Sequence, residues 1–328
     1  MNVTRADIKS FDTVARNPGL DFDLDWVYSV AVNRSAVERR AKTLPGRRSV
    51  KKQWQAAWLL KAVRCIDLTT LSGDDTPGRV KRLCAKARSP VRADILSALG
   101  LADASFHTGA VCVYHNMIAT AQEALAGTDI PIATVSTGFP AGQTPFELKI
   151  MEIERSVTAG AHEIDIVISR ELALTGNWSA LYDEVKAYRK ACGNAHLKTI
   201  LATGELMTLR NVARASIVCM MAGADFIKTS TGKEPVNATL PVALVMTRMI
   251  REYWDRTGYA IGFKPAGGIS SARDVLQYQF LIREELGPRW LEPDLFRVGA
   301  SSLLSDIERQ LEHNVSGSYA AYHRLAMG

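Results

Sequence analysis

The chain has 328 residues, 47% of them hydrophobic, and a formal net charge of +6. This length suits one large domain or two average ones, and the apolar content is sufficient for a large core. The sequence contains no uncharged apolar run of about 18 residues, and its polar start lacks the apolar region of a signal peptide. The sequence therefore predicts a soluble, cytoplasmic protein without a membrane segment.

The residues that usually hold metals and nucleotides show no matching pattern. The five cysteines are widely spread without a C-x-x-C pair, and the six histidines form no H-x-H or H-E-x-x-H spacing. G-x-G-x-x-G and P-loop patterns are also missing from the sequence. We therefore expect no metal and no cofactor. The densest basic patch, Arg47-Arg48 with Lys51-Lys52, is interpreted as a solvated helix face and not as a nucleic-acid surface.

Residues 1–61 precede any strand pattern. Trp54 and Trp58 stand one helical turn apart there, with Leu59 nearby. We expect these residues to form a helical extension that packs on the exterior of the following domain or closes its bottom.

From residue 62 to residue 312, short β-rich runs alternate with longer helical patterns. One such helical pattern places Phe146, Ile150, Ile153 and Val157 on a single face. The β-rich runs are 63–68, 110–115, 131–136, 163–169, 196–202, 225–231, 261–266 and 295–299. Alternation of this kind is typical of parallel strands with crossover helices. The sequence therefore predicts a single (β/α)8 TIM barrel, followed by a C-terminal tail at 313–328.

Two segments of the chain share one pattern. Residues 159–165 and 222–228 each begin with Ala-Gly-Ala and reach an isoleucine followed by a charged residue, Asp165 or Lys228. In each segment the glycine can end a helix in the left-handed conformation. We therefore place Asp165 and Lys228 at equivalent positions on the fourth and sixth strands.

The alternation of side chains along a strand turns five charged residues towards the barrel interior. Isoleucines flank Asp165 on both sides, so they face the helices and the carboxylate faces inward. The same argument turns Lys198, Lys228 and Lys264 inward, together with Asp67 on the first strand. A structural ion-pair network is the alternative interpretation, but five converging charges favour chemistry because each one is costly to desolvate.

A buried amine can become a nucleophile. At its ordinary pKa of about 10.4, a lysine is neutral about once in a few thousand molecules at pH 7, whereas a pKa near 7 makes half of them neutral. A second cation and partial burial both lower the pKa of an amine. Lys228 and Lys264 can act on each other in this way, and the residues alone leave open which one attacks a carbonyl. Asp165 can then carry protons to and from the resulting Schiff base.

Small residues after three strands predict a phosphate site. Gly267-Gly268 follow the seventh strand, and Gly299 with Ser301-Ser302 follows the eighth at the start of a helix, where this fold commonly binds anions. Thr231-Gly232-Lys233 follow the sixth strand and can add an amide donor and a cation.

Two further features have two interpretations each. Cys112, in the second strand, is a buried small apolar residue or a thiol open to inactivation near an aldehyde site. Tyr319 or Tyr322 in the tail either folds over the barrel mouth or belongs to a surface-packed terminus.

Five segments resemble the deoxyribose-phosphate aldolases. They are Ile66-Asp67-Leu68-Thr69-Thr70-Leu71, Glu163-Ile164-Asp165-Ile166-Val167, 197–206, 226–233 and 262–269. The resemblance runs from about Trp54 to His323 and is to the longer members of the family, which carry an N-terminal extension.

The resemblance implies a metal-free class I aldolase that reversibly cleaves 2-deoxy-D-ribose 5-phosphate to D-glyceraldehyde 3-phosphate and acetaldehyde. It makes Lys228 the Schiff-base lysine, and Asp165 and Lys264 the proton donor and acceptor residues. Asp67 lines the site by the same resemblance, and Lys198 belongs to the proton relay. Gly267, Gly268, Ser301 and Ser302 match the phosphate-binding segments.

Three readings of the site and one expectation about partners follow. The first reading is the aldolase. The second is a sugar-phosphate isomerase or epimerase without a covalent intermediate, and the third is a non-catalytic barrel that binds phosphate ligands. The expected partners are the phosphorylated sugar and acetaldehyde, without nucleic acid or membrane, and a homodimer is possible.

Overall fold

The computed structural model describes residues 14–102, 105–321 and 325. Eight parallel strands follow one another around a ring, in the order β7-β6-β5-β4-β3-β2-β1-β8. The strands are β1 Ile66–Thr69, β2 Ala110–Val113, β3 Ile132–Ser136, β4 Glu163–Val167, β5 His196–Ile200, β6 Phe226–Lys228, β7 Gly262–Lys264 and β8 Val298–Ala300. Two isolated bridges close the ring. One joins Phe263 of β7 to Phe296, just before β8, and the other joins Ala266, just after β7, to Gly299 of β8. The predicted TIM barrel is confirmed.

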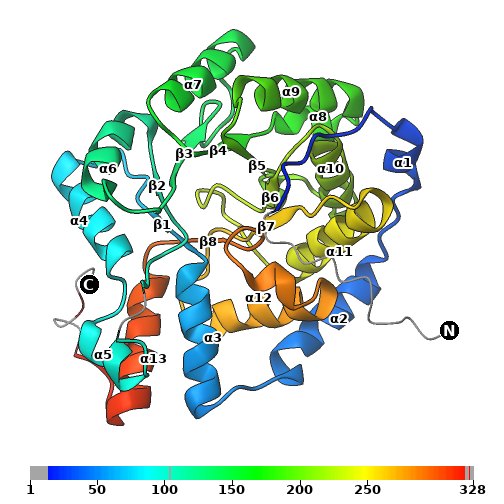
Figure 1. The fold of residues 1–328 in the computed structure, drawn as a ribbon. Helices are drawn as coiled ribbons and strands as arrows, with labels where there is room; N and C mark the ends of the chain where they lie inside the picture. The colour runs from blue at the N-terminus through cyan, green and yellow to red at the C-terminus, as the bar shows by residue number, and fades with distance from the viewer. Residues whose placement is uncertain (1–13, 103–104, 322–324, 326–328) are drawn as a thin grey trace.

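Helices surround the strands on the outside, as Figure 1 shows. They are α4 Pro77–Arg88, α5 Ala93–Ala98, α6 Ile118–Leu125, α7 Phe146–Thr158, α8 Arg170–Leu174, α9 Trp178–Ala191, α10 Leu209–Met221, α11 Leu240–Thr257, α12 Ala272–Glu285 and α13 Leu303–Ser316. Short 3₁₀ segments lie at His115–Met117, Thr203–Glu205 and Pro288–Leu291. Gly160 and Gly223, after α7 and α10, have φ values of 98° and 100°, as expected for the left-handed helix stops.

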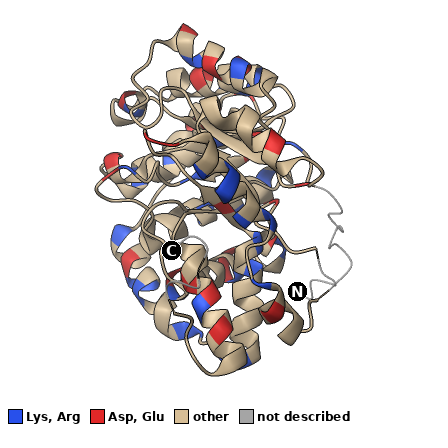
Figure 2. Cartoon of the chain, turned by 90° about the vertical axis from the view of Figure 1, so that its left-hand side faces the viewer, with Lys and Arg blue, Asp and Glu red and all other residues tan. Residues whose placement is uncertain are grey.

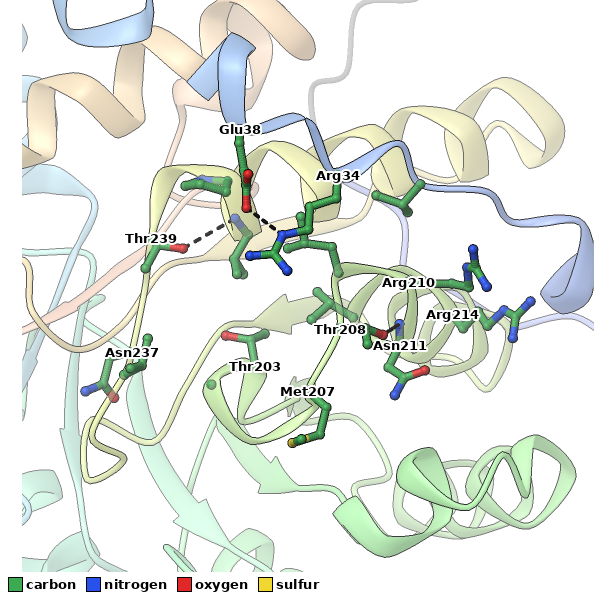
Figure 3. Close-up of a pocket in the computed structure, with 17 residues that line it drawn as sticks. Arg34, Glu38, Thr203, Met207, Thr208, Arg210, Asn211, Arg214, Asn237 and Thr239 are labelled. Carbon is green, nitrogen blue, oxygen red and sulfur yellow. Dashed lines mark hydrogen bonds and ion pairs between the residues drawn. The ribbon is translucent and has the colours of Figure 1, made fainter. Parts of the chain in front are cut away.

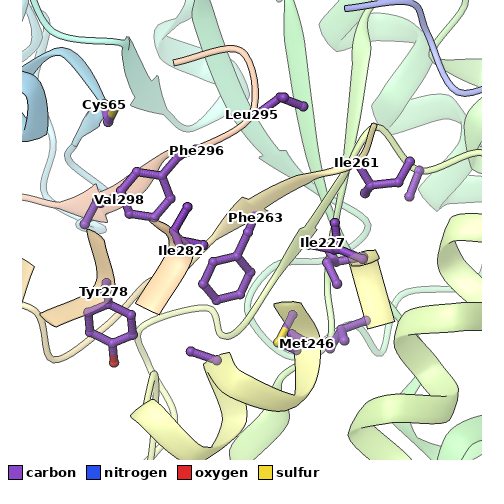
Figure 4. Packing of buried hydrophobic residues seen from close by; sticks show 14 of the residues in the cluster. Cys65, Ile227, Met246, Ile261, Phe263, Tyr278, Ile282, Leu295, Phe296 and Val298 are labelled. Carbon is purple, nitrogen blue, oxygen red and sulfur yellow. The ribbon is translucent and has the colours of Figure 1, made fainter. Parts of the chain in front are cut away.

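The main core lies between the strands and this ring of helices. Ile227, Phe263 and Phe296 are fully buried there, among the side chains drawn in Figure 4. Side chains alternate along a strand, so the residues between those of the core point into the barrel interior. On α7, Ile153 is fully buried whereas Phe146 is 45% exposed, so the predicted apolar face of that helix is only partly covered.

Three further helices, α1 Leu24–Ser29, α2 Arg34–Arg47 and α3 Lys52–Arg64, precede the barrel. Helix α2 packs on α11 and α12, and α3 packs on α12 and α13. Trp58 contributes to this packing, but Trp54 is 68% exposed. Upstream, the buried Asn17 side chain donates to the carbonyls of Met220 (2.7 Å) and Ala224 (2.9 Å), close to the entry of β6. The N-terminal segment therefore covers both the exterior of the barrel and part of its bottom.

The predicted boundaries at 61/62 and 312/313 both fall inside helices. Val63 was predicted to open the first strand, but it is a buried residue in the last turn of α3, where it continues the buried face of Leu59 and Leu60. Helix α13 runs on to Ser316 and ends at Gly317, whose φ of 76° supplies the left-handed stop.

The basic patch of the sequence is part of a contact between helices. Arg47 and Arg48 both lie near the Glu284 carboxylate of α12, at 3.5 and 3.1 Å. Positive and negative residues are interspersed over the helices in Figure 2. None of the helices in the described part of the chain is long and apolar enough to cross a membrane.

Candidate active site

The five charged residues predicted to face inward are all buried inside the barrel. Each comes from a different strand, and the strand register places Asp165 beside Lys198 and Lys228 beside Lys264. Asp67, on β1, is fully buried too. The alternation of apolar and charged residues thus brings together side chains that are far apart in the sequence.

Asp165 is the centre of this group. Its Oδ2 accepts hydrogen bonds from Lys228 Nζ at 2.8 Å and from Lys264 Nζ at 2.7 Å, and its Oδ1 accepts one from Lys198 Nζ at 3.2 Å. Lys264 also forms an ion pair with Asp67. Asp165 can therefore exchange protons with either lysine that is a candidate nucleophile.

Two buried charges of the same interior were missed from the sequence. Arg297 Nη1 lies 2.6 Å from Asp67 Oδ1, and its Nη2 lies 2.9 Å from Glu163 Oε1. Glu163 also pairs with Lys198. A signal for Glu163 was present, since it stands two residues before Asp165 and so faces the same side of β4. Arg297 had a comparable signal, since Phe296 and Val298 flank it within the predicted run 295–299 and the alternation of a strand therefore turns it inward.

With every group ionised, the charges of this interior do not balance. Three carboxylates (Asp67, Glu163 and Asp165) face four cations (Lys198, Lys228, Lys264 and Arg297). If one of the lysines loses its proton, the set becomes electrically neutral. A buried set of this kind favours neutrality because desolvation penalises any net charge.

The surroundings of each amine decide which one loses its proton. Burial lowers the pKa of Lys228; Asp165 opposes that effect, Lys264 adds to it, and the result is a pKa below the ordinary value. Burial also lowers the pKa of Lys264 and Lys198, but their nearby carboxylates outweigh it and raise both. For Asp165, burial favours the protonated form, but the three lysines prevail and hold its pKa well below the ordinary range. Lys228 is therefore the lysine whose ammonium group loses its proton most easily.

A cavity of about 290 Å³ opens above Lys228. Of the five predicted interior charges, Lys228 lines it, whereas Asp67, Asp165, Lys198 and Lys264 do not. The other lining residues are Thr69, Leu71, Thr231, Gly232, Lys233, Ala266, Gly267, Gly268, Ile269, Ser270, Gly299, Ala300, Ser301 and Ser302. Every residue predicted to contact the phosphate thus lies around one cavity, which has an amine in its wall.

The loops around this cavity differ in what they can offer an anion. Gly267 has a φ of 81°, and a Cβ at this position would lie 2.6 Å from the side chain of Asn237, so only glycine fits. Ser301 and Ser302 stand at the start of α13, where the helix dipole favours negative charge.

Two expected amide donors are occupied. The amide of Gly232 donates to Glu234 at 3.1 Å, and the amide of Gly299 donates to the Pro265 carbonyl at 3.0 Å in the closure of the barrel. The Gly232 amide, which we expect to contact an anion, thus donates here to the Glu234 carboxylate that caps its turn. The side chain of Lys233 remains at the cavity wall.

Cys112 and the tail are also placed by the structure. Cys112 is 1% exposed, and burial raises the pKa of its thiol. Tyr319 stacks on His313 of α13, with ring centroids 4.3 Å apart, and is 54% exposed. It therefore packs on the surface of the preceding helix α13; Tyr322 lies outside the described residues.

A larger cavity of about 720 Å³ lies outside the barrel, between α10, α11 and the start of α2. Figure 3 shows its lining, with the ion pair of Arg34 and Glu38 at one side. Lysines are missing from its described wall, so it offers no amine to a carbonyl group. In the described parts of the chain, no group of three or more His, Cys, Asp or Glu residues is arranged to hold a metal ion.

Residues 61–279 match the family model described as DeoC/LacD family aldolase. The chain belongs to this family.

Relatives extend the similarity beyond the barrel. The deoxyribose-phosphate aldolase of Homo sapiens is 60% identical over 315 residues, which cover 95% of this chain and 99% of the human protein. That of Mus musculus is 62% identical over 94% of this chain and 98% of its own length. The similarity therefore includes the N-terminal helices.

A solved structure shares the fold of this aldolase barrel at lower identity. The deoxyribose phosphate aldolase from Aeropyrum pernix, whose structure is described as a unique tetramer, has a TM-score of 0.58 and 22% identity. The match covers 80% of this chain and 97% of that one.

Proposed function

We propose that this chain catalyses the reversible aldol cleavage of 2-deoxy-D-ribose 5-phosphate to D-glyceraldehyde 3-phosphate and acetaldehyde. The family and the relatives at 60% and 62% identity support the activity. One observation in the structure supports the mechanism: Lys228, the interior amine whose pKa is lowered, lines a cavity walled by the glycines and serines of an anion site.

The proposed reaction starts with the neutral Lys228 amine. It attacks the aldehyde carbon of the open-chain sugar, and loss of water from the carbinolamine gives a protonated Schiff base. Removal of the proton from the 3-hydroxyl then breaks the bond between C2 and C3. That step releases glyceraldehyde 3-phosphate and leaves an enamine on Lys228. Protonation of the enamine carbon and hydrolysis release acetaldehyde and restore the amine.

Asp165 and Lys264 are the proposed proton carriers. The Asp165 carboxylate, 2.8 Å from Lys228 Nζ, can accept a proton from the attacking amine or the hydroxyl. Lys264, 2.7 Å from the same carboxylate oxygen, can return it. Lys198 and Asp67 hold this pair in place through further ion pairs.

The phosphate is proposed to bind among the cavity residues that follow β7 and β8. Gly267, Gly268, Ser301 and Ser302 line the cavity, and Lys233 adds a positive charge. Binding there fixes the sugar at one end, so that its aldehyde reaches Lys228. A homodimer remains an expectation, tested by the mass of the protein in solution.

Capture of the imine tests this proposal. The protein is incubated with acetaldehyde, reduced with borohydride and mapped by mass spectrometry. The expected result is a reduced two-carbon adduct on Lys228. An unmodified Lys228 peptide would contradict the aldolase and favour one of the two non-covalent readings, which a turnover assay on pentose phosphates then separates.

A further inference from the structure

Glu163 and Arg297 link the proposed catalytic residues to one another without reaching the cavity. Arg297 bridges Asp67 and Glu163 at 2.6 and 2.9 Å, and Glu163 pairs with Lys198. Neither residue lines the cavity that Lys228 does. Their influence on the reaction must therefore pass through Lys198 and Asp67.

A purely structural role explains this pair poorly. Glu163 is 3% exposed and Arg297 is 6% exposed, and a buried ion pair is commonly no more stabilising than apolar residues of similar volume. Their net charge is zero, so the pair does not change the total charge of the interior. The pair does change how charge is distributed in the interior, because Glu163 lies next to Lys198 and Arg297 lies next to Asp67.

A cavity at the bottom of the barrel reaches Glu163 and Arg297. Its volume is about 650 Å³, and Glu163, Arg297, His162 and His196 line it. The site cavity lies at the other end of the strands, around the loops that follow β6, β7 and β8. Glu163 and Arg297 thus stand between the solvent at the bottom and the charges around Lys228.

We propose that Glu163 and Arg297 are positioning residues that fix Lys198 and Asp67 and thereby set, in opposite directions, the pH at which Lys228 becomes a nucleophile. This inference rests on the proposed function. The groups that act on Lys228 directly are Asp165 from β4, Lys264 from β7 and Cys112 from β2. The groups around Glu163 are Arg297, Lys198, Asp67 and His196.

The sign of each effect follows from the contacts. Without the Glu163 charge, Lys198 is left with Asp165 as its nearest carboxylate, and the positive potential around Lys228 increases. Lys228 then loses its proton at lower pH. Without the Arg297 charge, Asp67 keeps only Lys264 and Lys198 as its cationic partners, and the positive potential around Lys228 falls. Lys228 then loses its proton at higher pH. Three ion pairs connect Glu163 to Lys228, and four connect Arg297 to it. A charge at this distance is expected to shift the pKa of Lys228 by about one unit.

The test is the pH dependence of imine formation with acetaldehyde, quenched with borohydride between about pH 5 and pH 10. In the wild type, the rate rises with pH as Lys228 loses its proton. The acid limb of this profile is expected about one pH unit lower in E163Q and about one unit higher in R297M. The double variant E163Q/R297M and the charge-preserving R297K are expected near the wild-type position.

A matched control separates electrostatics from loss of stability. Lys86 and Glu308 form a buried ion pair at 2.6 Å on the helices α4 and α13, outside the barrel interior. E308Q also breaks a buried ion pair, and its acid limb is expected to stay in place even if its unfolding midpoint falls.

The outcomes are distinct from those of the proposed function. If the wild type forms no imine, the proposed function fails. If the wild type forms it but E163Q has an unchanged acid limb, or one that moves to higher pH, this inference is overturned and the proposed function stands. If R297M does not fold, the shift of the acid limb in E163Q tests the inference by itself.

Discussion

The substitution Lys264→Leu removes the cation that the structure places beside the proposed nucleophile. Lys228 Nζ and Lys264 Nζ contact the same Asp165 oxygen at 2.8 and 2.7 Å, so the two nitrogens lie no more than about 5.5 Å apart. At that separation and an effective dielectric constant of about 20, two unit charges repel each other by about 3 kcal/mol. This repulsion corresponds to about two pKa units on Lys228.

The loss of this repulsion leads to a defined change in the pH profile. The pKa of Lys228 is expected to rise, and Asp165, freed from Lys264, stabilises the ammonium further. Because the neutral amine is the nucleophile, its population at pH 7 falls about a hundredfold. Turnover at pH 7 is expected to fall by at least that factor, and imine formation is expected to recover as the pH is raised by about two units.

The assay measures turnover and imine capture in parallel across pH. Lys264→Arg is the control, since it keeps the charge but exchanges protons poorly. It is expected to keep the acid limb of imine formation near the wild-type position while turnover stays low. Near-normal turnover of Lys264→Leu at pH 7, with an unshifted acid limb, would refute the coupling between the two lysines.

Three further changes test other parts of the structure. Asp165→Asn is expected to lower turnover at least about a hundredfold while the first imine still forms; steady-state rates within tenfold of the wild type would contradict its proton role. Ser302→Glu places a negative charge at the cavity and is expected to raise KM for the phosphorylated substrate at least about tenfold, because the carboxylate repels the phosphate. Imine capture from acetaldehyde, which has no phosphate, is expected to stay the same. A KM equal to that of the wild type would show that the phosphate binds elsewhere. Gly262→Ala places a Cβ 2.3 Å from the Phe226 ring and is expected to lower the free energy of unfolding by about 1–3 kcal/mol in a denaturant titration; an unchanged midpoint would show that the ring can move aside.

Much of the fold could be predicted because its signals are local. Strand and helix patterns have different periods, and the Ala-Gly-Ala stops before β4 and β6 mark the same offset in two units. The strand ends could not be fixed in this way. Lys228 ends β6, whereas the pattern continued to Thr231, because the carboxylate of Glu234 draws the Thr231 amide into a capped turn.

By itself, the sequence determined which way the charges of the strands point. Isoleucines on both sides of Asp165 require its carboxylate to face the interior, and the same alternation applies to Lys198, Lys228 and Lys264. That conclusion needs only the period of a strand, which every residue in it obeys.

Only the tertiary structure decided how these charges are paired. The residues alone left Lys228 and Lys264 equivalent, whereas in the folded chain Lys264 lies between two carboxylates and Lys228 contacts one of them. Glu163 and Arg297 enter the same network from positions 134 residues apart. Electrostatic energies depend on distances of a few ångströms between side chains from different strands, and those distances exist only once the barrel has closed.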